Sequence, residues 1–185
     1  MQPLFTQEEL EALRSGGART TSNYRDKQYE GGENALRQKL EKTRTLYVGN
    51  LSFFTSEFQI YSLFEKAGRV EKVIIGLDRF KKTPCGFCFV MYFLNIPHYN
   101  FCILNCQRMA DRAGAEACVD HISGTMLDNR YIRCDLDAGF VDGRQYGRSR
   151  LGGQVRDKYR TNYDKARGGF GYFKSKNVTR QSFIK

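Results

Sequence analysis

The sequence is poor in histidine, the side chain used most often for general acid–base catalysis. It contains no tryptophan, and its two histidines are His98 and His121. No serine–histidine–acid set and no pair of carboxylates flanking a cleft can be recognised, so we expect no enzymatic activity. Long apolar runs are also missing, because the longest, 85–104, is interrupted by Asn95 and Pro97. A membrane-spanning helix needs roughly 18 apolar residues, so none is expected.

No secretory leader is expected, because the first ten residues are acidic at Glu8 and Glu9. The six cysteines are therefore expected as free thiols in a reducing compartment. The 185 residues are expected to form one domain with long flanking segments, or at most two small domains.

Four of the cysteines mimic the spacing of zinc ligands. Cys85 and Cys88 are separated by two residues, and Cys102 and Cys106 by three. Residues three apart on a strand point to opposite faces, so Cys85 and Cys88 would not converge on one tetrahedral ion. His98, Cys102 and Cys106 would share one face of a helix, which leaves a surface metal site as a weak alternative. We expect no metal or other cofactor.

Positive charge is abundant and unevenly distributed. Lys and Arg total 30 against 20 for Asp and Glu, which gives a formal net charge of +10. Residues 136–185 contain twelve of the basic residues, four of the acidic ones, eight glycines and eight tyrosines or phenylalanines. Basic segments with interleaved rings suit phosphates and bases, because neutralised phosphates release counterions and rings stack on bases. The charge alone does not separate RNA from DNA or an anionic membrane.

The hydrophobic pattern predicts an α+β domain of order βαββαβ, a ferredoxin-like sandwich with two helices behind a four-stranded antiparallel sheet. Ser56 and Gly68 are placed to cap the two ends of the first helix. Three segments are expected: an N-terminal extension at 1–44, the domain at 45–135, and a basic arm at 136–185 that stays disordered until bound. The expected strands are 45–50, 69–77, 85–93 and 129–135, and the expected helices are 7–14, 33–42, 57–67 and 111–122.

Two strand motifs, 46–51 and 85–92, resemble the signature motifs of RNA-recognition-motif domains. Because strand side chains alternate between faces, Tyr47, Phe87 and Phe89 would share the open face and form a platform for unstacked bases. The alternative is that these rings are buried under a helix or a partner. Cys85 stands where the family usually has Lys or Arg, and Cys88 where Gly or Ala is usual. An apolar insertion at 94–110 also departs from the family pattern.

A wider resemblance covers most of the chain up to about residue 171. The segments 23–26, 45–53, 85–90 and 137–157 resemble the family of small subunits of the nuclear cap-binding complex. The resemblance implies recognition of the 7-methylguanosine cap, whose cationic base would be stacked between Tyr24 and Tyr47. The N-terminal extension would then fold over the sheet to bring Tyr24 to the base.

The same resemblance assigns the polar contacts of the cap. Carboxylates are suitable acceptors for the N1–H and 2-amino groups of a cationic guanine, and charge-assisted hydrogen bonds are strong. Base contacts would come from the backbone near Arg133, from Asp135 and Asp137, and from Leu136, which replaces the family's usual tryptophan. The triphosphate contacts would come from Arg144, Arg148, Gln154, Val155 through its backbone, and Arg156.

The resemblance also implies a biological setting. The chain would form a heterodimer with a large helical-repeat subunit, bind capped RNA without a membrane, and reside in the nucleus with shuttling to the cytoplasm. The family acts in splicing, in export and in RNA surveillance, which includes nonsense-mediated decay. Two alternatives remain open: a generic single-stranded RNA binder of the splicing or hnRNP type, and a protein-interaction module whose sheet face is covered by protein.

Overall fold

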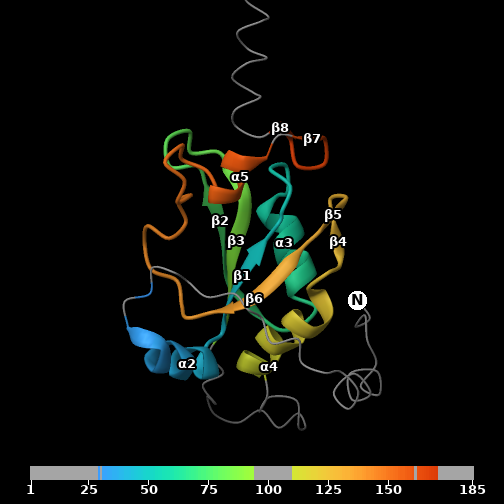
Figure 1. The fold of residues 1–185 in the computed structure, drawn as a ribbon. Helices are drawn as coiled ribbons and strands as arrows, with labels where there is room; N and C mark the ends of the chain where they lie inside the picture. The colour runs from blue at the N-terminus through green and yellow to red at the C-terminus, as the bar shows by residue number, and fades with distance from the viewer. Residues whose placement is uncertain (1–28, 30, 94–109, 161, 171–185) are drawn as a thin grey trace, which may run out of the picture.

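The structure of the protein, a computed structural model, describes residue 29 and residues 31–93, 110–160 and 162–170 (Figure 1). The expected helix at 7–14, Tyr24, and almost all of the insertion, with His98, Cys102 and Cys106, lie outside these residues. Within the described part, no helix is both long enough and apolar enough to cross a bilayer.

A four-stranded antiparallel sheet, with the helices α3 and α4 on one of its faces, forms the centre of the molecule, as Figure 1 shows. The expected α+β sandwich of the RNA-recognition-motif type is confirmed. The sheet has the order β2-β3-β1-β6, from β1 (Thr45–Gly49), β2 (Val70–Leu77), β3 (Pro84–Tyr92) and β6 (Arg133–Asp137). The helices are α2 (Gly32–Lys42), α3 (Glu57–Phe64) and α4 (Ala110–Ala117), which continues as η2 (Cys118–Ile122).

The core lies between the sheet and α3, α4 and η2. It is built from inward-facing strand residues such as Leu46, Val48, Cys88 and Val90, all of which are fully buried. These are the residues that strand alternation places on the inner face. The hydroxyl of Tyr92 donates to the Phe64 carbonyl at 3.0 Å and lies 2.8 Å from the Cys118 sulfur, so its buried polar group is satisfied.

The first core helix begins as the sequence predicts and ends three residues early. Ser56 and Gln59 form a capping box, in which each side chain bonds the other's backbone N–H. The helix ends at Phe64, whereas the expected end was residue 67. After Phe64 the chain turns more tightly than an α-helix, because the Ala67 N–H donates to the Phe64 carbonyl, three residues back, instead of to a carbonyl four residues back.

The fourth strand of the sheet is shorter than predicted. Residues 129–132, which were expected in it, belong instead to a hairpin of β4 (Met126–Leu127) and β5 (Arg130–Tyr131). Asp128 and Asn129 form the turn with φ of 49° and 60°, a conformation that Asp and Asn tolerate. The Asp128 carboxylate also binds the side chains of Thr55 at 2.6 Å and Gln59 at 2.8 Å, so the hairpin is anchored to α3.

The described parts of the basic arm, residues 136–160 and 162–170, are folded, contrary to the expectation that the arm is disordered until bound. It runs from the end of β6 past the open face of the sheet, the face opposite the helices, to α5 and a hairpin (Figure 1). Backbone bonds from Leu77 N to Gln145 O (2.7 Å) and from Gly147 N to Leu77 O (2.8 Å) attach it to β2. The arm has no core of its own and packs against the sheet instead. Its elements are α5 (Val155–Tyr159), β7 (Tyr163–Asp164) and β8 (Gly169–Phe170).

Candidate nucleic-acid interface

Three aromatic rings meet on the open face of the sheet. Tyr47 on β1 pairs with Phe89 on β3, and Phe87 stands two residues before Phe89 on the same strand. The ring centroids of Tyr47 lie 5.7 Å from Phe87 and 5.8 Å from Phe89, and the two phenylalanines are 6.0 Å apart. The strand alternation therefore places the three rings together, as predicted from the two motifs.

The rings of the two phenylalanines are nevertheless not exposed, so the expected open platform is wrong in this respect. Phe87 is 6% exposed and Phe89 2%, whereas Tyr47 is half-buried. Phe140 in the arm packs edge-on against Phe89 with centroids 5.4 Å apart, and the Arg144 guanidinium lies 4.9 Å from the same ring. The sheet face thus has a filled aromatic floor, with Tyr47 as its more accessible ring.

Two carboxylates flank the rings. In the β1–β6 pair, Asp135 stands opposite Tyr47 and Asp137 stands opposite Thr45, so both project from the open face. Leu136 pairs with Leu46 and packs against the core on the helical side. The residue that replaces the family's tryptophan therefore directs its side chain away from Tyr47. Its backbone remains in the strand that carries the two carboxylates.

The carboxylates differ in their own partners. Arg133 Nε donates to Asp135 Oδ2 at 2.7 Å, and the Arg133 side chain is 49% exposed. Arg144 donates to both oxygens of Asp137, at 2.6 and 2.7 Å, and also bonds the Gly139 carbonyl. Asp137 was predicted to bind the cap base and Arg144 its phosphates, yet the structure pairs them with each other.

The remaining predicted phosphate ligands lie further along the arm. Gln154 precedes α5 and donates from Nε2 to the Cys85 carbonyl at 2.7 Å, which attaches α5 to the start of β3. Val155 and Arg156, the first residues of α5, are exposed, as is Arg148. Gly86 allows this close approach, since its φ is +85° and a Cβ there would lie 3.4 Å from Gln154 Nε2 and 2.9 Å from the Leu51 carbonyl oxygen.

The two cysteines that suggested zinc ligands face different sides of the sheet. Cys88 belongs to the core beneath the helices, whereas Cys85 packs with Phe87 and Phe89 on the open face. This geometry is the one predicted for residues three apart on a strand. Burial raises the pKa of the Cys85 thiol to about 12, with a further contribution from nearby Asp157, so this thiol is protonated at neutral pH.

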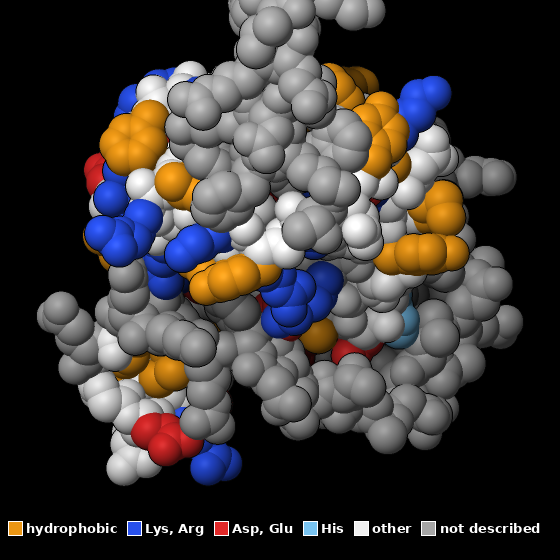
Figure 2. Space-filling view, turned by 45° about the horizontal axis from the view of Figure 1, so that its top comes forward, with side chains coloured by type: hydrophobic (Ala, Val, Ile, Leu, Met, Phe, Trp, Pro, Cys, Tyr) orange, Lys and Arg blue, Asp and Glu red, His pale blue; other side chains and the backbone are white. Residues whose placement is uncertain are grey.

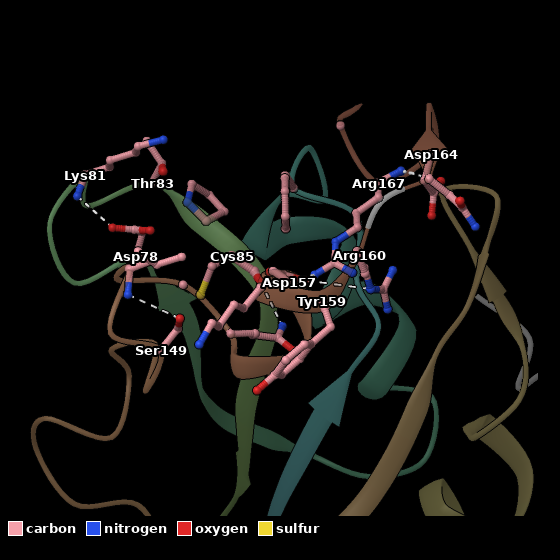
Figure 3. A pocket seen from close by; sticks show the side chains of 18 of the residues that line it. Asp78, Lys81, Thr83, Cys85, Ser149, Asp157, Tyr159, Arg160, Asp164 and Arg167 are labelled. Carbon is pink, nitrogen blue, oxygen red and sulfur yellow. Dashed lines mark hydrogen bonds and ion pairs between the residues drawn. The ribbon is translucent and has the colours of Figure 1, made fainter. Parts of the chain in front are cut away.

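A cavity of about 720 Å³ opens at the end of the sheet where β3 begins (Figure 3). Arg167 pairs with Asp157 there and stacks on the Phe53 ring at 5.1 Å, and Arg160 lies 3.8 Å from the same carboxylate. Burial raises the pKa of Asp157, while the neighbouring Arg167 and Arg160 act in the opposite direction. The walls combine basic, acidic and aromatic side chains from the loop after β2, from α5 and from the β7–β8 hairpin.

Sequence reasoning did not identify Arg130, Asp157 or Arg167 as important to this end of the molecule. Arg130 is buried, bonds the backbone and side chain of Asn50, and pairs with Asp164 in β7. A deeply buried arginine carries no local sequence signal, because its partners lie far away along the chain. The exposed rings of Phe80 and Tyr159 do carry a local sequence signal, because each stands between two basic residues in the sequence. Lys, Arg and hydrophobic side chains are intermingled on this end of the molecule in Figure 2.

Comparison with known proteins identifies both the domain and the family. The RNA recognition motif family matches residues 46–109. Nuclear cap-binding protein subunit 2 of Bombyx mori is 51% identical over 150 residues, which cover 81% of this chain and 86% of the relative. The human protein of the same name is 51% identical over 162 residues, which cover 88% and 93%. That of Drosophila ananassae is 48% identical over 157 residues, which cover 85% and 91%.

The fold comparison is less informative than the sequence relatives. A solved structure of the Rna15 RRM with bound RNA covers 55% of this chain and 92% of its own at 17% identity, with a TM-score of 0.39. Family membership therefore rests on sequence identity of about one half along nearly the whole length of several relatives. The chain belongs to the nuclear cap-binding protein subunit 2 family.

Proposed function

We propose that this chain binds the 7-methylguanosine cap of nuclear transcripts and that it does so without catalysis. Methylation at N7 gives guanine a delocalised positive charge, so the ring gains cation–π attraction in addition to stacking. The observation that carries the proposal is the pairing of Tyr47 with Asp135 across β1 and β6. An aromatic ring and a carboxylate on one face are the two groups that a cationic purine requires.

In this proposal Tyr47 supplies one face of the stack and Tyr24, which lies outside the described residues, supplies the other. Asp135 accepts from the N1–H and 2-amino edge, and the backbone of Arg133 and Leu136 completes the reading of the base. The Arg133 side chain is 49% exposed and can turn toward solvent, whereas the Asp135 side chain is 4% exposed, so the cationic base would replace the guanidinium as the partner of a buried carboxylate. Phe87 and Phe89 form the floor under Tyr47 rather than separate base platforms.

The triphosphate would extend from the base toward the start of α5. Arg148 and Arg156 have exposed side chains there, the Val155 backbone begins the helix, and Gln154 is fixed by its bond to Cys85. Arginine suits phosphate because its planar guanidinium can donate two parallel hydrogen bonds. The net charge of +10 adds long-range attraction for the RNA that follows the cap.

The relatives are named as subunits of a nuclear complex. We therefore propose that this chain functions in the nucleus as a heterodimer with a large helical-repeat subunit, shuttles to the cytoplasm with its RNA, and serves splicing, export and surveillance. Gel filtration of the two co-expressed subunits tests the heterodimer, and fractionation of cells followed by immunoblotting tests the nuclear location. Two separate peaks at micromolar concentration would count against the heterodimer.

The proposed activity is tested by retention of the full chain, with and without the large subunit, on a 7-methyl-GTP resin. Free 7-methyl-GTP should elute the protein at a concentration at least about a hundredfold below that of GTP, a difference of about 2.7 kcal/mol. Equal elution by both nucleotides would indicate a generic single-stranded RNA binder instead. Absence of any RNA or nucleotide binding with the large subunit present would indicate a protein-interaction module.

A further inference from the structure

The loop between β2 and β3, residues 78–83, lies alongside the arm (Figure 1). The Arg79 N–H donates to the Gly152 carbonyl at 2.8 Å, and Lys82 Nζ lies 3.9 Å from the centroid of the Tyr146 ring. A Cβ on Gly152 would lie 2.8 Å from Cδ2 of Phe80, so the Phe80 ring packs closely against the arm. The loop and the arm, which are far apart in the sequence, thus form one continuous surface.

The loop is held in one conformation by its own hydrogen bonds. The Asp78 N–H donates to the Thr83 carbonyl at 2.8 Å, and the Lys82 N–H donates to the Asp78 carbonyl at 2.9 Å. The Asp78 carboxylate accepts from the N–H groups of Phe80 and Lys81, both at 2.9 Å (Figure 3). Asp78 is 9% exposed, so its negative charge lies inside the loop. The outward side chains therefore start from an ordered backbone, which lowers the entropy lost when they bind a ligand.

The charge of this surface is strongly positive. Residues 78–83 and 146–156, together called the basic surface, contain six Lys or Arg and one acidic residue, Asp78. All six basic residues are exposed: Arg79, Lys81, Lys82, Arg148, Arg150 and Arg156. Arg148 and Arg156 are proposed ligands of the cap triphosphate, whereas the other four have no part in the proposed cap site. Positive charge therefore continues beyond the triphosphate, and neutralising further phosphates there would release counterions.

An exposed aromatic ring stands among these charges. Phe80 is 67% exposed and lies between Arg79 and Lys81 in the loop. A ring of this kind suits single-stranded RNA, because every base has a π face that can stack on it while neighbouring cations bind the backbone. An acidic protein segment would use the positive charges, but Asp and Glu have no ring to stack on Phe80. The combination of ring and charge thus favours RNA as the occupant.

We propose that the basic surface binds the nucleotides that follow the cap, with Phe80 stacking on a base and with Arg79, Lys82 and Arg150 contacting phosphates. The inference rests on the proposed function, which places the cap triphosphate beside Arg148. Contacts to the backbone and to π faces carry no sequence information, so the surface accepts any transcript. The cap site fixes the 5′ end, and the basic surface adds affinity for the RNA attached to it.

Two probes separate the basic surface from the cap site: 7-methyl-GTP and a capped, unstructured RNA of about ten nucleotides. Each is titrated against the full chain with its large subunit. The capped RNA should bind at least about tenfold more tightly than 7-methyl-GTP. Phe80→Ala should weaken the capped RNA about tenfold and change 7-methyl-GTP affinity less than about twofold, whereas Phe80→Tyr, which keeps a ring, should bind like wild type. Equal affinity of the wild-type protein for both probes would overturn the proposal.

The salt dependence of binding tests the phosphate contacts. The double variant Arg79→Gln, Lys82→Gln should flatten the plot of log affinity for capped RNA against log salt concentration by about 1.4, or about 0.7 for each lost contact. Phe80→Ala should leave this slope unchanged, because it removes no charge. The matched control is Lys42→Gln, Lys66→Gln, which removes two exposed lysines outside the basic surface and should leave the slope unchanged. An equal flattening in this control would overturn the proposal, since only net charge would then matter.

An RNA of the same sequence with an unmethylated 5′-triphosphate separates this inference from the proposed function. If the wild-type protein bound both RNAs equally, cap recognition would fall, and the effect of Phe80→Ala on the unmethylated RNA would still decide the role of the basic surface. Photo-crosslinking from 4-thiouridine placed directly after the cap, located by mass spectrometry, should label residues 78–83 or 146–156. Labels confined to other segments, or equal losses of 7-methyl-GTP and capped RNA in the loop variants, would overturn the proposal.

Discussion

Tyr47 and Asp135 stand directly opposite each other on neighbouring strands, and both project from the sheet face that the arm crosses. Cross-strand partners on one face are separated by roughly 5 Å between Cβ atoms. A planar ligand stacked on the tyrosine can therefore direct its edge at the carboxylate without any rearrangement of the sheet. The register of two strands, rather than a mobile loop, sets this relationship.

Replacement of Tyr47 by alanine should remove most of the discrimination between 7-methyl-GTP and GTP. Loss of the cation–π and stacking contact is expected to cost about 2 kcal/mol for the methylated nucleotide, or about thirtyfold in affinity. Competition binding measures both affinities. Tyr131→Ala is the matched control, because Tyr131 is exposed on β5 away from the aromatic floor. A ratio that survives Tyr47→Ala would contradict the stacking role.

Substitution of Leu136 by tryptophan, the residue usual in the family, should change 7-methyl-GTP affinity by less than about threefold. The Leu136 side chain packs on the helical side of the sheet, opposite the face of Tyr47. Its contribution to the base is thus confined to the backbone, which the substitution retains. Tighter binding by tenfold or more, measured in the same competition assay, would show that an indole reaches the base.

Tyr92→Phe should lower the free energy of unfolding by about 1–2 kcal/mol, since it leaves the buried partners of a hydroxyl group unsatisfied. The hydroxyl bonds the Phe64 carbonyl and the Cys118 sulfur in the core. Urea denaturation measures the change, and nucleotide affinity should be unaffected. Tyr61→Phe is a graded control with a smaller expected loss, because Tyr61 is half-buried and its bond to Val70 is 3.2 Å long.

The attachment of the β7–β8 hairpin should weaken in acid. A hydrogen bond from Arg130 lowers the pKa of Asp164 below the ordinary carboxyl value. A group whose pKa is lower in the folded state stabilises that state above its unfolded pKa of about 4, and the stabilisation is lost as pH falls through the folded value. The protection of amides 162–170, which is the ratio of the intrinsic to the observed exchange rate at each pH, should therefore fall below about pH 4, when measured from pH 6 to pH 2.5.

The variant Arg130→Gln tests whether the hydrogen bond from Arg130 is what lowers the pKa of Asp164. The variant should bring the titration of Asp164, followed by carbon NMR, close to the ordinary carboxyl value, and hairpin exchange should already be fast at neutral pH. Arg133→Gln removes an arginine near the same sheet without touching Asp164 and should change neither quantity. An unshifted Asp164 titration in Arg130→Gln would show that another group lowers its pKa.

Features encoded by neighbours in sequence could be predicted well. Ser56, the predicted cap, does set the start of α3, and the alternation in two strand motifs correctly separates Tyr47 and Phe89 from Val48 and Cys88. These depend on backbone periodicity and on contacts within one turn. Family resemblance added the candidate ligands of the cap, whose contacts with the nucleotide remain predictions.

Features that depend on distant contacts could not be predicted. The arm has the composition of a disordered segment. The residues next to Phe140 and Arg167 in the sequence do not indicate that Phe140 packs against Phe89 or that Arg167 stacks on Phe53. The burial of Phe87 and Phe89 follows from that docking, so it was missed for the same reason. The Asp128–Asn129 turn was not predicted, because Asn129 was assigned to the start of the expected fourth strand.

The parallel bridge between Leu77 and Tyr146 has a consequence for solubility. β2 is an outer strand of the sheet, and outer strands offer unpaired N–H and C=O groups to other chains. The arm occupies both backbone groups of Leu77 and so blocks part of this edge from intermolecular strand pairing. The segment to which the proposed phosphate ligands belong thereby also protects the sheet edge from self-association, and a truncation at residue 135 would expose that edge to aggregation.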